Sequence, residues 1–96
     1  MMRPEGPWDA AAADFDAANP DVMAELVNLA RRWRKRGRAV WGVGAAFEVL
    51  RWQRAMQTND ANSDFKLNHN YKAWFARELM RRHPDLDGVF RLRGGA

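Results

Sequence analysis

Apolar residues recur at intervals of three and four along three stretches of the chain, which is the spacing of one face of a helix. The stretches cover residues 20–36, 43–56 and 68–82. Asn19-Pro20-Asp21 is typical of a helix start, because Asn caps free amides and Pro fits the first helical position. Gly37 and the pair His83-Pro84 are typical of helix ends. The sequence therefore predicts three main helices.

Shorter patterns surround these helices. Residues 8–18 form an Ala-rich acidic stretch that predicts a further short helix, and residues 38–41 are compatible with a brief strand. Over residues 89–93, Phe90 and Leu92 alternate with Arg91 and Arg93, which predicts a half-buried strand with a cationic outer face. The expected fold is mainly α, with three to four helices and a short C-terminal β-strand or hairpin.

Charge divides the chain of 96 residues into two parts. Residues 1–21 carry a net charge of −4 and the remainder carries +8, which together give +4. We therefore expect an acidic N-terminal segment with a short helix at 1–19 and a basic helical domain at 20–96. A basic surface favours polyanions, of which nucleic acid is the commonest, although it is also compatible with an ordinary solvated surface. The acidic segment either competes with DNA for the basic body or, more simply, keeps the chain soluble.

The residues needed for catalysis are scarce. The chain has no Cys, one Ser, one Thr and two His, and no acidic or His residues stand at metal-ligand spacing. No Gly-rich loop follows a strand and opens a helix. We expect neither an enzyme, a metal site nor a cofactor. The lack of Cys and of a long apolar run favours a cytoplasmic protein without a membrane segment.

The order of helix, short strand, helix, helix and strand over residues 20–93 resembles a winged helix-turn-helix domain. The stretches Trp41 to Trp52, Asp64 to Asn68 and Tyr71 to Met80 are similar to a family of small proteins from phages and integrated mobile elements. The connection from Gln57 to Leu67 is longer than a tight helix-turn-helix turn, and only one return strand is visible. A simple helical bundle with a short strand pair is the alternative.

A winged-helix architecture implies that the third helix enters a DNA groove and that nearby cations contact phosphates. Asn68 and Asn70 at the start of that helix are candidates to contact bases, although either one could instead cap the helix. The complete set of candidate nucleic-acid-binding residues is Arg31, Arg32, Arg34, Lys35, Arg36, Arg38, Asn68, His69, Asn70, Lys72, Arg77, Arg81, Arg91 and Arg93.

Two functions are compatible with these features. The first is a small phage-type or mobile-element-type DNA-binding protein that acts as a regulator or recombination accessory. The alternative is a protein-interaction module that binds and inhibits a host protein, since Arg and Trp are typical of interface hot spots. Most aromatic residues lie on predicted core faces, but Trp41 and Trp52 do not, and either one could lie at the interface of a homodimer.

Overall fold

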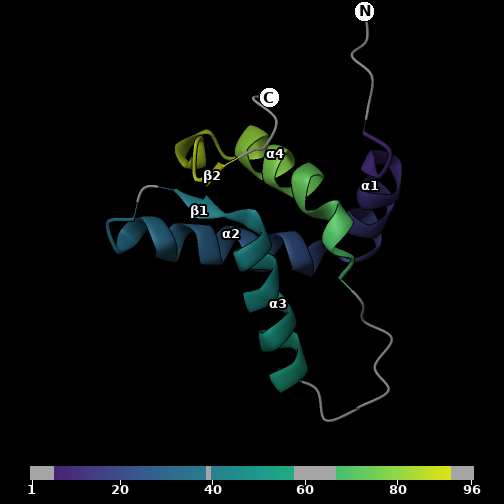
Figure 1. Cartoon of the computed structure of the whole chain (residues 1–96), viewed down its shortest axis with the longest axis horizontal. Coiled ribbons are helices and arrows are strands. Elements are labelled where there is room, and N and C mark those ends of the chain that lie inside the picture. The colour runs from purple at the N-terminus through teal and green to yellow at the C-terminus, as the bar shows by residue number, and fades with distance from the viewer. Residues whose placement is uncertain (1–5, 39, 58–66, 92–96) are drawn as a thin grey trace, which may run out of the picture.

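Helices dominate the computed structural model, which describes residues 6–38, 40–57 and 67–91 and confirms the expected mainly α fold. The elements, in chain order, are α1 (Asp9–Ala18), α2 (Pro20–Lys35), β1 (Trp41–Gly42), α3 (Val43–Gln57), the 3-10 helix η1 (His69–Tyr71), α4 (Lys72–Arg82), the 3-10 helix η2 (Pro84–Leu86) and β2 (Phe90–Arg91). Figure 1 shows α4 lying across the molecule, with α1 at one end and the two strands near the other.

The core is built around α4, which contacts each of α1, α2 and α3. Phe75, Ala76 and Leu79, at helical spacing on α4, are fully buried. The ring of Phe75 meets that of Phe47 from α3 edge-on at 5.7 Å, and that of Phe15 from α1 edge-on at 6.3 Å. Such edge-to-face pairs add to the stabilisation from apolar burial. One apolar stripe thus fixes the positions of three other helices.

The acidic helix α1 shares this core, since its Ala12 is fully buried. At its junction with α2, the sequence predicts that the Asn19 side chain caps the first amides of α2. The structure shows instead that Asn19 Nδ2 donates a hydrogen bond to the carbonyl of Phe15, at 3.0 Å, and makes no cap of α2. The side chain of Asn19 therefore adds a second hydrogen bond to this carbonyl in the last turn of α1, which already accepts from the Asn19 backbone amide at 2.9 Å. A side-chain amide can donate as well as accept.

The start of the third predicted helix also differs from the expected form. Residues 69–71 form η1, and the α-helical hydrogen-bond pattern begins only at Lys72. The Asn68 side chain accepts a hydrogen bond from the Asn70 amide at 2.9 Å and so caps η1. A 3-10 turn is common at the N-terminus of a helix. The sequence predicts either base contact or helix capping for Asn68 and Asn70, and the structure shows Asn68 in the capping role.

The strands form a two-stranded parallel sheet in which Trp41 pairs with Phe90 and Gly42 with Arg91. The chain returns to this position through a turn at Gly88, whose φ of +81° suits glycine. Because the pairing is parallel, β1 and β2 do not form a hairpin. Of the two predicted forms, a short C-terminal strand or a hairpin, the described residues contain the strand. Val89 is buried together with Phe90, so the alternation of burial begins only at Arg91. Leu92 and Arg93 lie outside the described residues.

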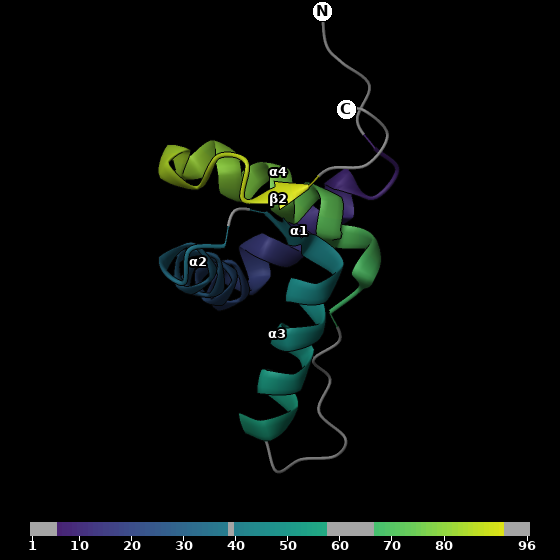
Figure 2. The same cartoon turned by 60° about the vertical axis from the view of Figure 1, so that its left-hand side comes forward.

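The later turns of α3 extend away from the other elements, as Figures 1 and 2 both show. The first turns of α3 bury Val43, Phe47 and Leu50 against the core. Further along the helix, Trp52 and Met56 are 64% and 67% exposed. The end of α3 therefore exposes two large apolar side chains among polar neighbours.

We predict that Phe75→Ala destabilises the fold by about 3 to 5 kcal/mol, because it removes the ring shared by three helices and leaves a cavity. Chemical denaturation followed by circular dichroism measures this change. The matched control is Val40→Ala, which shortens a side chain that is 44% exposed and should change the free energy of unfolding by less than about 0.5 kcal/mol. Equal effects of the two substitutions would contradict the central position of α4.

Candidate nucleic-acid interface

Two of the predicted site residues at the end of α2 have internal partners. Arg31 forms an ion pair with Asp85, and its guanidinium also lies 3.3 Å from Nδ1 of His83. Arg34 donates hydrogen bonds to the backbone carbonyls of Asp85, at 3.2 Å, and Asp87, at 2.8 Å. These contacts join α2 to the segment that leads into β2. Arg31 and Arg34 therefore hold the fold together at this end.

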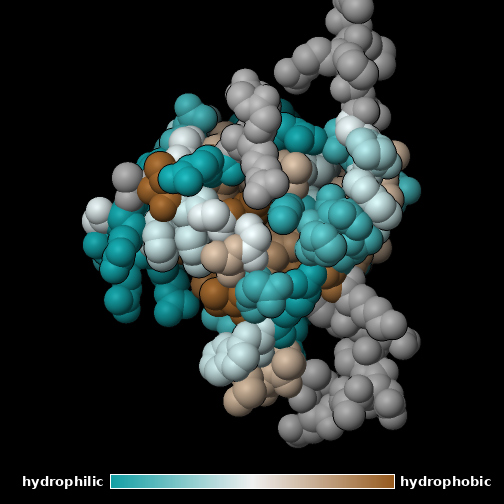
Figure 3. All heavy atoms as spheres, viewed as in Figure 1, coloured by the Kyte–Doolittle hydropathy of each residue, from teal (hydrophilic) through white to brown (hydrophobic). Residues whose placement is uncertain are grey.

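Four other cations follow at the same end and are all exposed: Arg32, Lys35, Arg36 and Arg38. We call them the α2 cluster. Among the described residues none of the four has a carboxylate partner. Figure 3 shows hydrophilic side chains projecting from this end of the molecule, at the left of the view. The α2 cluster is therefore an exposed group of positive charges that the described acids do not neutralise.

Stacked aromatic rings support the base of the α2 cluster. Trp33 and Trp41 stack with centroids 4.5 Å apart and ring planes 4° from parallel. The guanidinium of Arg38 lies over the Trp33 ring, 5.6 Å from its centroid. The intramolecular stack accounts for Trp41, one of the two aromatic residues that the helical pattern leaves unexplained. It also ties the last turn of α2 to β1.

The predicted site residues fall into separate groups. The α2 cluster lies beside residues 83–87, which follow the end of α4, through the contacts of Arg31 and Arg34. The candidates Asn68 to Lys72 lie at the opposite end of α4, whose 11 residues span about 16 Å at the usual helical rise. The structure thus does not bring the α2 cations to the start of the third predicted helix.

A smaller group lies near that helix start. His69 and Asn70 are exposed, while Lys72 is half-buried. A β-carbon placed on Gly44 would lie 3.7 Å from Nζ of Lys72, so this amine is beside the first turn of α3. Arg91, which is exposed, is in register with Gly42 directly before that turn. Lys72 and Arg91 are therefore both placed near the beginning of α3.

The remaining candidates, Arg77 and Arg81 on α4, have acidic partners. Arg77 donates to both carboxylate oxygens of Asp9, at 2.9 Å each, and so connects α4 with the acidic helix α1. Arg81 donates to both oxygens of Glu78, one turn away on its own helix. Their charges are compensated within the chain, in contrast to those of the α2 cluster.

Glu78 and Arg82 form the centre of a network of ion pairs on α4, which the sequence did not indicate. Arg82 donates to Glu78 at 2.7 Å and to Asp16 of α1 at 2.9 Å. Hydrogen bonds from Arg81 and then from Arg82 lower the pKa of Glu78 to about 2, against the effect of its burial. The spacing of Glu78 from Arg81 and Arg82 is a local signal for such pairing, whereas Asp16 is 66 residues away from Arg82.

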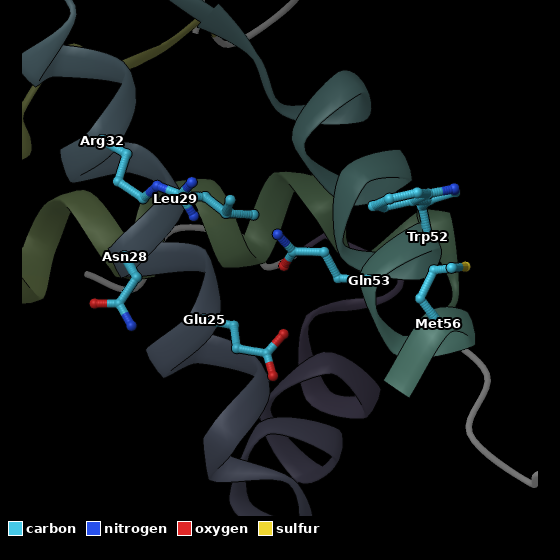
Figure 4. Close-up of a pocket in the computed structure, with 7 residues that line it drawn as sticks. All are labelled: Glu25, Asn28, Leu29, Arg32, Trp52, Gln53 and Met56. Atoms are coloured by element: carbon cyan, nitrogen blue, oxygen red, sulfur yellow. The ribbon is translucent and has the colours of Figure 1, made fainter. Parts of the chain in front are cut away.

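A groove lies between α2 and α3, with a volume of about 390 Å³. The residues that line it are Glu25, Asn28, Leu29 and Arg32 from α2 and Trp52, Gln53 and Met56 from α3. Figure 4 shows Leu29 and Glu25 of α2 pointing towards α3 and Gln53 of α3 reaching towards α2, with Trp52 and Met56 further out on α3. Arg32 thus belongs to both the groove and the α2 cluster. Trp52, the second unexplained aromatic residue, is exposed at its edge.

Metal-binding clusters and membrane-spanning helices are absent from the described part of the chain. It contains no group of three or more acidic, His or Cys side chains that could hold a metal ion. No helix within it is both long and apolar enough to cross a bilayer. The chain matches no family model, and comparisons with curated proteins and with solved structures give no significant match. A proposal about function therefore rests on the geometry of the described residues alone.

We predict that Glu78→Gln lowers stability at neutral pH by about 1 kcal/mol, because a partly exposed ion-pair network loses its charge. The folded-state pKa of Glu78 is about 2, below its ordinary value of 4.5, so the ionised carboxylate stabilises the fold above pH 4.5. That contribution is lost as the pH falls towards 2, and the two proteins should become equally stable there. Denaturant titrations between pH 7 and 2 measure this convergence.

Asp14→Asn is the control for this prediction, because Asp14 is an exposed acid of α1 that has no ion pair within the described residues. It should leave the pH dependence of unfolding close to that of the unsubstituted chain. If Glu78→Gln also left that dependence unchanged, Glu78 would not be the stabilising carboxylate.

Proposed function

We propose that this protein binds DNA and that the α2 cluster contacts the phosphate backbone, in the manner of a small regulator or recombination accessory. The observation that carries the proposal is the group of four exposed cations, within residues 32–38, that lack a carboxylate partner among the described residues. Arg and Lys side chains contribute to DNA affinity by replacing counterions along the phosphates. Such contacts position a protein on DNA and carry no sequence information directly.

The number of cations supports a ligand more than it supports helix stability. Positive side chains near a helix C-terminus each stabilise the helix by about 0.3 to 1 kcal/mol, and the effect is limited to the last turn. Arg31 and Arg34 already serve the fold through their contacts with residues 85–87. The α2 cluster adds four more charges close together, whose mutual repulsion is relieved when a polyanion binds.

The role of α4 in this proposal is secondary. Asn70, Ala73, Arg77 and Arg81 are exposed and lie along one side of the helix, which is the arrangement expected of a helix that enters a groove. Binding of Arg77 or Arg81 to DNA would first break its ion pair with Asp9 or Glu78. We therefore assign the phosphate contacts to the α2 cluster and not to the cations of α4.

We predict that the double substitution Lys35→Gln with Arg36→Gln weakens binding to random duplex DNA and reduces its salt dependence. Four phosphate contacts give a slope of log affinity against log salt concentration of about −3.6, and loss of two contacts should bring the slope to about −1.8. Fluorescence anisotropy titrations at several salt concentrations measure both the affinity and the slope.

The matched control is Arg77→Gln with Arg81→Gln, which removes the same formal charge from cations that already have acidic partners. This pair should leave the slope nearly unchanged. Equal losses of slope in the two variants would show that only the net charge matters. A slope near zero for the unsubstituted chain would overturn DNA binding.

The second candidate function, a module that binds and inhibits a host protein, is favoured by a different observation. Trp52 and Met56 expose 64% and 67% of their surface beside a groove, and exposed Trp is typical of interface hot spots. This function makes no use of Lys35 or Arg36. Recovery of a stoichiometric protein from nuclease-treated lysate that depends on Trp52, together with a zero salt slope on DNA, would favour it over DNA binding.

A further inference from the structure

The end of α3 presents an apolar surface that its own fold does not cover. Trp52 and Met56 stand one turn apart and are the most exposed large apolar residues in the described chain. This part of α3 extends beyond the neighbouring helices in Figures 1 and 2, and its residues are paler and more hydrophobic in Figure 3 than those at the end of α2. Burial of such side chains on association is favourable, because their contact with water is removed.

The groove beside these residues holds chemically opposite groups. Glu25 and Arg32 are seven positions apart on α2, and so they lie on the same face of that helix, near opposite ends of the groove. Between them stand the amide of Asn28 and the buried Leu29. The groove therefore carries a complement for each of its own kinds of group: a base for the acid, a second amide for the amide, and apolar side chains for apolar side chains.

We propose that this groove is the interface through which the protein pairs with a second copy of itself. A two-fold axis beside Asn28 and Leu29, midway between Glu25 and Arg32, makes the two α2 helices antiparallel. Each Glu25 then faces the partner copy's Arg32, and each α3 end brings Trp52 and Met56 against the other copy. A two-fold interface requires such a self-complementary patch.

Charge favours this occupant over a nucleic acid or a strongly charged protein. A polyanion in the groove would meet the carboxylate of Glu25, and a polycation would meet the guanidinium of Arg32. The guanidinium of Arg54 is shared by Asp21, at 2.5 Å, and by Oε1 of Glu25, at 3.2 Å, so one negative charge remains at this end to balance Arg32 at the other. Only a partner with both signs, in the reverse order, matches both ends. A second copy satisfies that condition.

Sedimentation equilibrium of the whole chain over a range of concentrations tests the pairing. We expect the mass to rise from that of one chain, 11.1 kDa, towards twice that value. Trp52→Ser should raise the dissociation constant by at least about tenfold, as loss of an aromatic anchor does. Trp8→Ser is the matched control, because Trp8 is also exposed but lies outside the groove, and it should leave the association unchanged.

A charge reversal tests the antiparallel arrangement. Arg32→Glu places two acids opposite each other and should weaken the association. Lys35→Glu makes the same change in net charge outside the groove and should not weaken it. Trp52→Ser should keep its affinity for duplex DNA, so the outcome is independent of the DNA-binding proposal.

Three results would overturn the inference. One is a mass of a single chain that does not change up to about 1 mM, where even a weak dimer forms. Another is self-association that Trp52→Ser leaves intact. The third is a gain in mass that occurs only when a different macromolecule is added.

Discussion

Burial of one side of α4 is the constraint on which the rest of the described structure depends. Phe75, Ala76 and Leu79 have no exposed surface, and the other three α-helices of the described residues all contact this helix. Because contact of these apolar side chains with water is unfavourable, this stripe faces inwards. The opposite side of α4 is then fixed as well, which leaves Arg77 and Arg81 at the surface, within reach of Asp9 and Glu78.

The net charge of the basic body overstates the positive charge that is available to a ligand. Arg31 is paired with Asp85, and Arg82 is paired with both Glu78 and Asp16, so these cations already act within the fold. Arg34 has no acidic partner but holds two backbone carbonyls. What distinguishes the α2 cluster is therefore the lack of a described carboxylate partner, and not its sign alone.

Local patterns were sufficient to predict the helices, because apolar periodicity and the effects of Gly and Pro act over a few residues. They were not sufficient for contacts between distant segments. The partner of Arg82 in α1 is 66 residues away, and the parallel pairing of Trp41 with Phe90 depends on the path of the chain between them. Asn19 shows a further limit of local patterns. Its side chain can either accept or donate a hydrogen bond, and only the surrounding backbone determined that it donates one to the carbonyl of Phe15.

The two proposed surfaces share Arg32 of α2, which faces the partner copy's Glu25 in the dimer, while Lys35, Arg36 and Arg38 lie outside the groove and stay available to DNA. In the antiparallel pairing, an axis beside Asn28 lies about 10 Å along the helix from Lys35, so the two cation clusters stand about 20 Å apart. Repulsion over that distance is largely screened at physiological salt, where the Debye length is about 8 Å. The pairing therefore tolerates two positive clusters on one assembly.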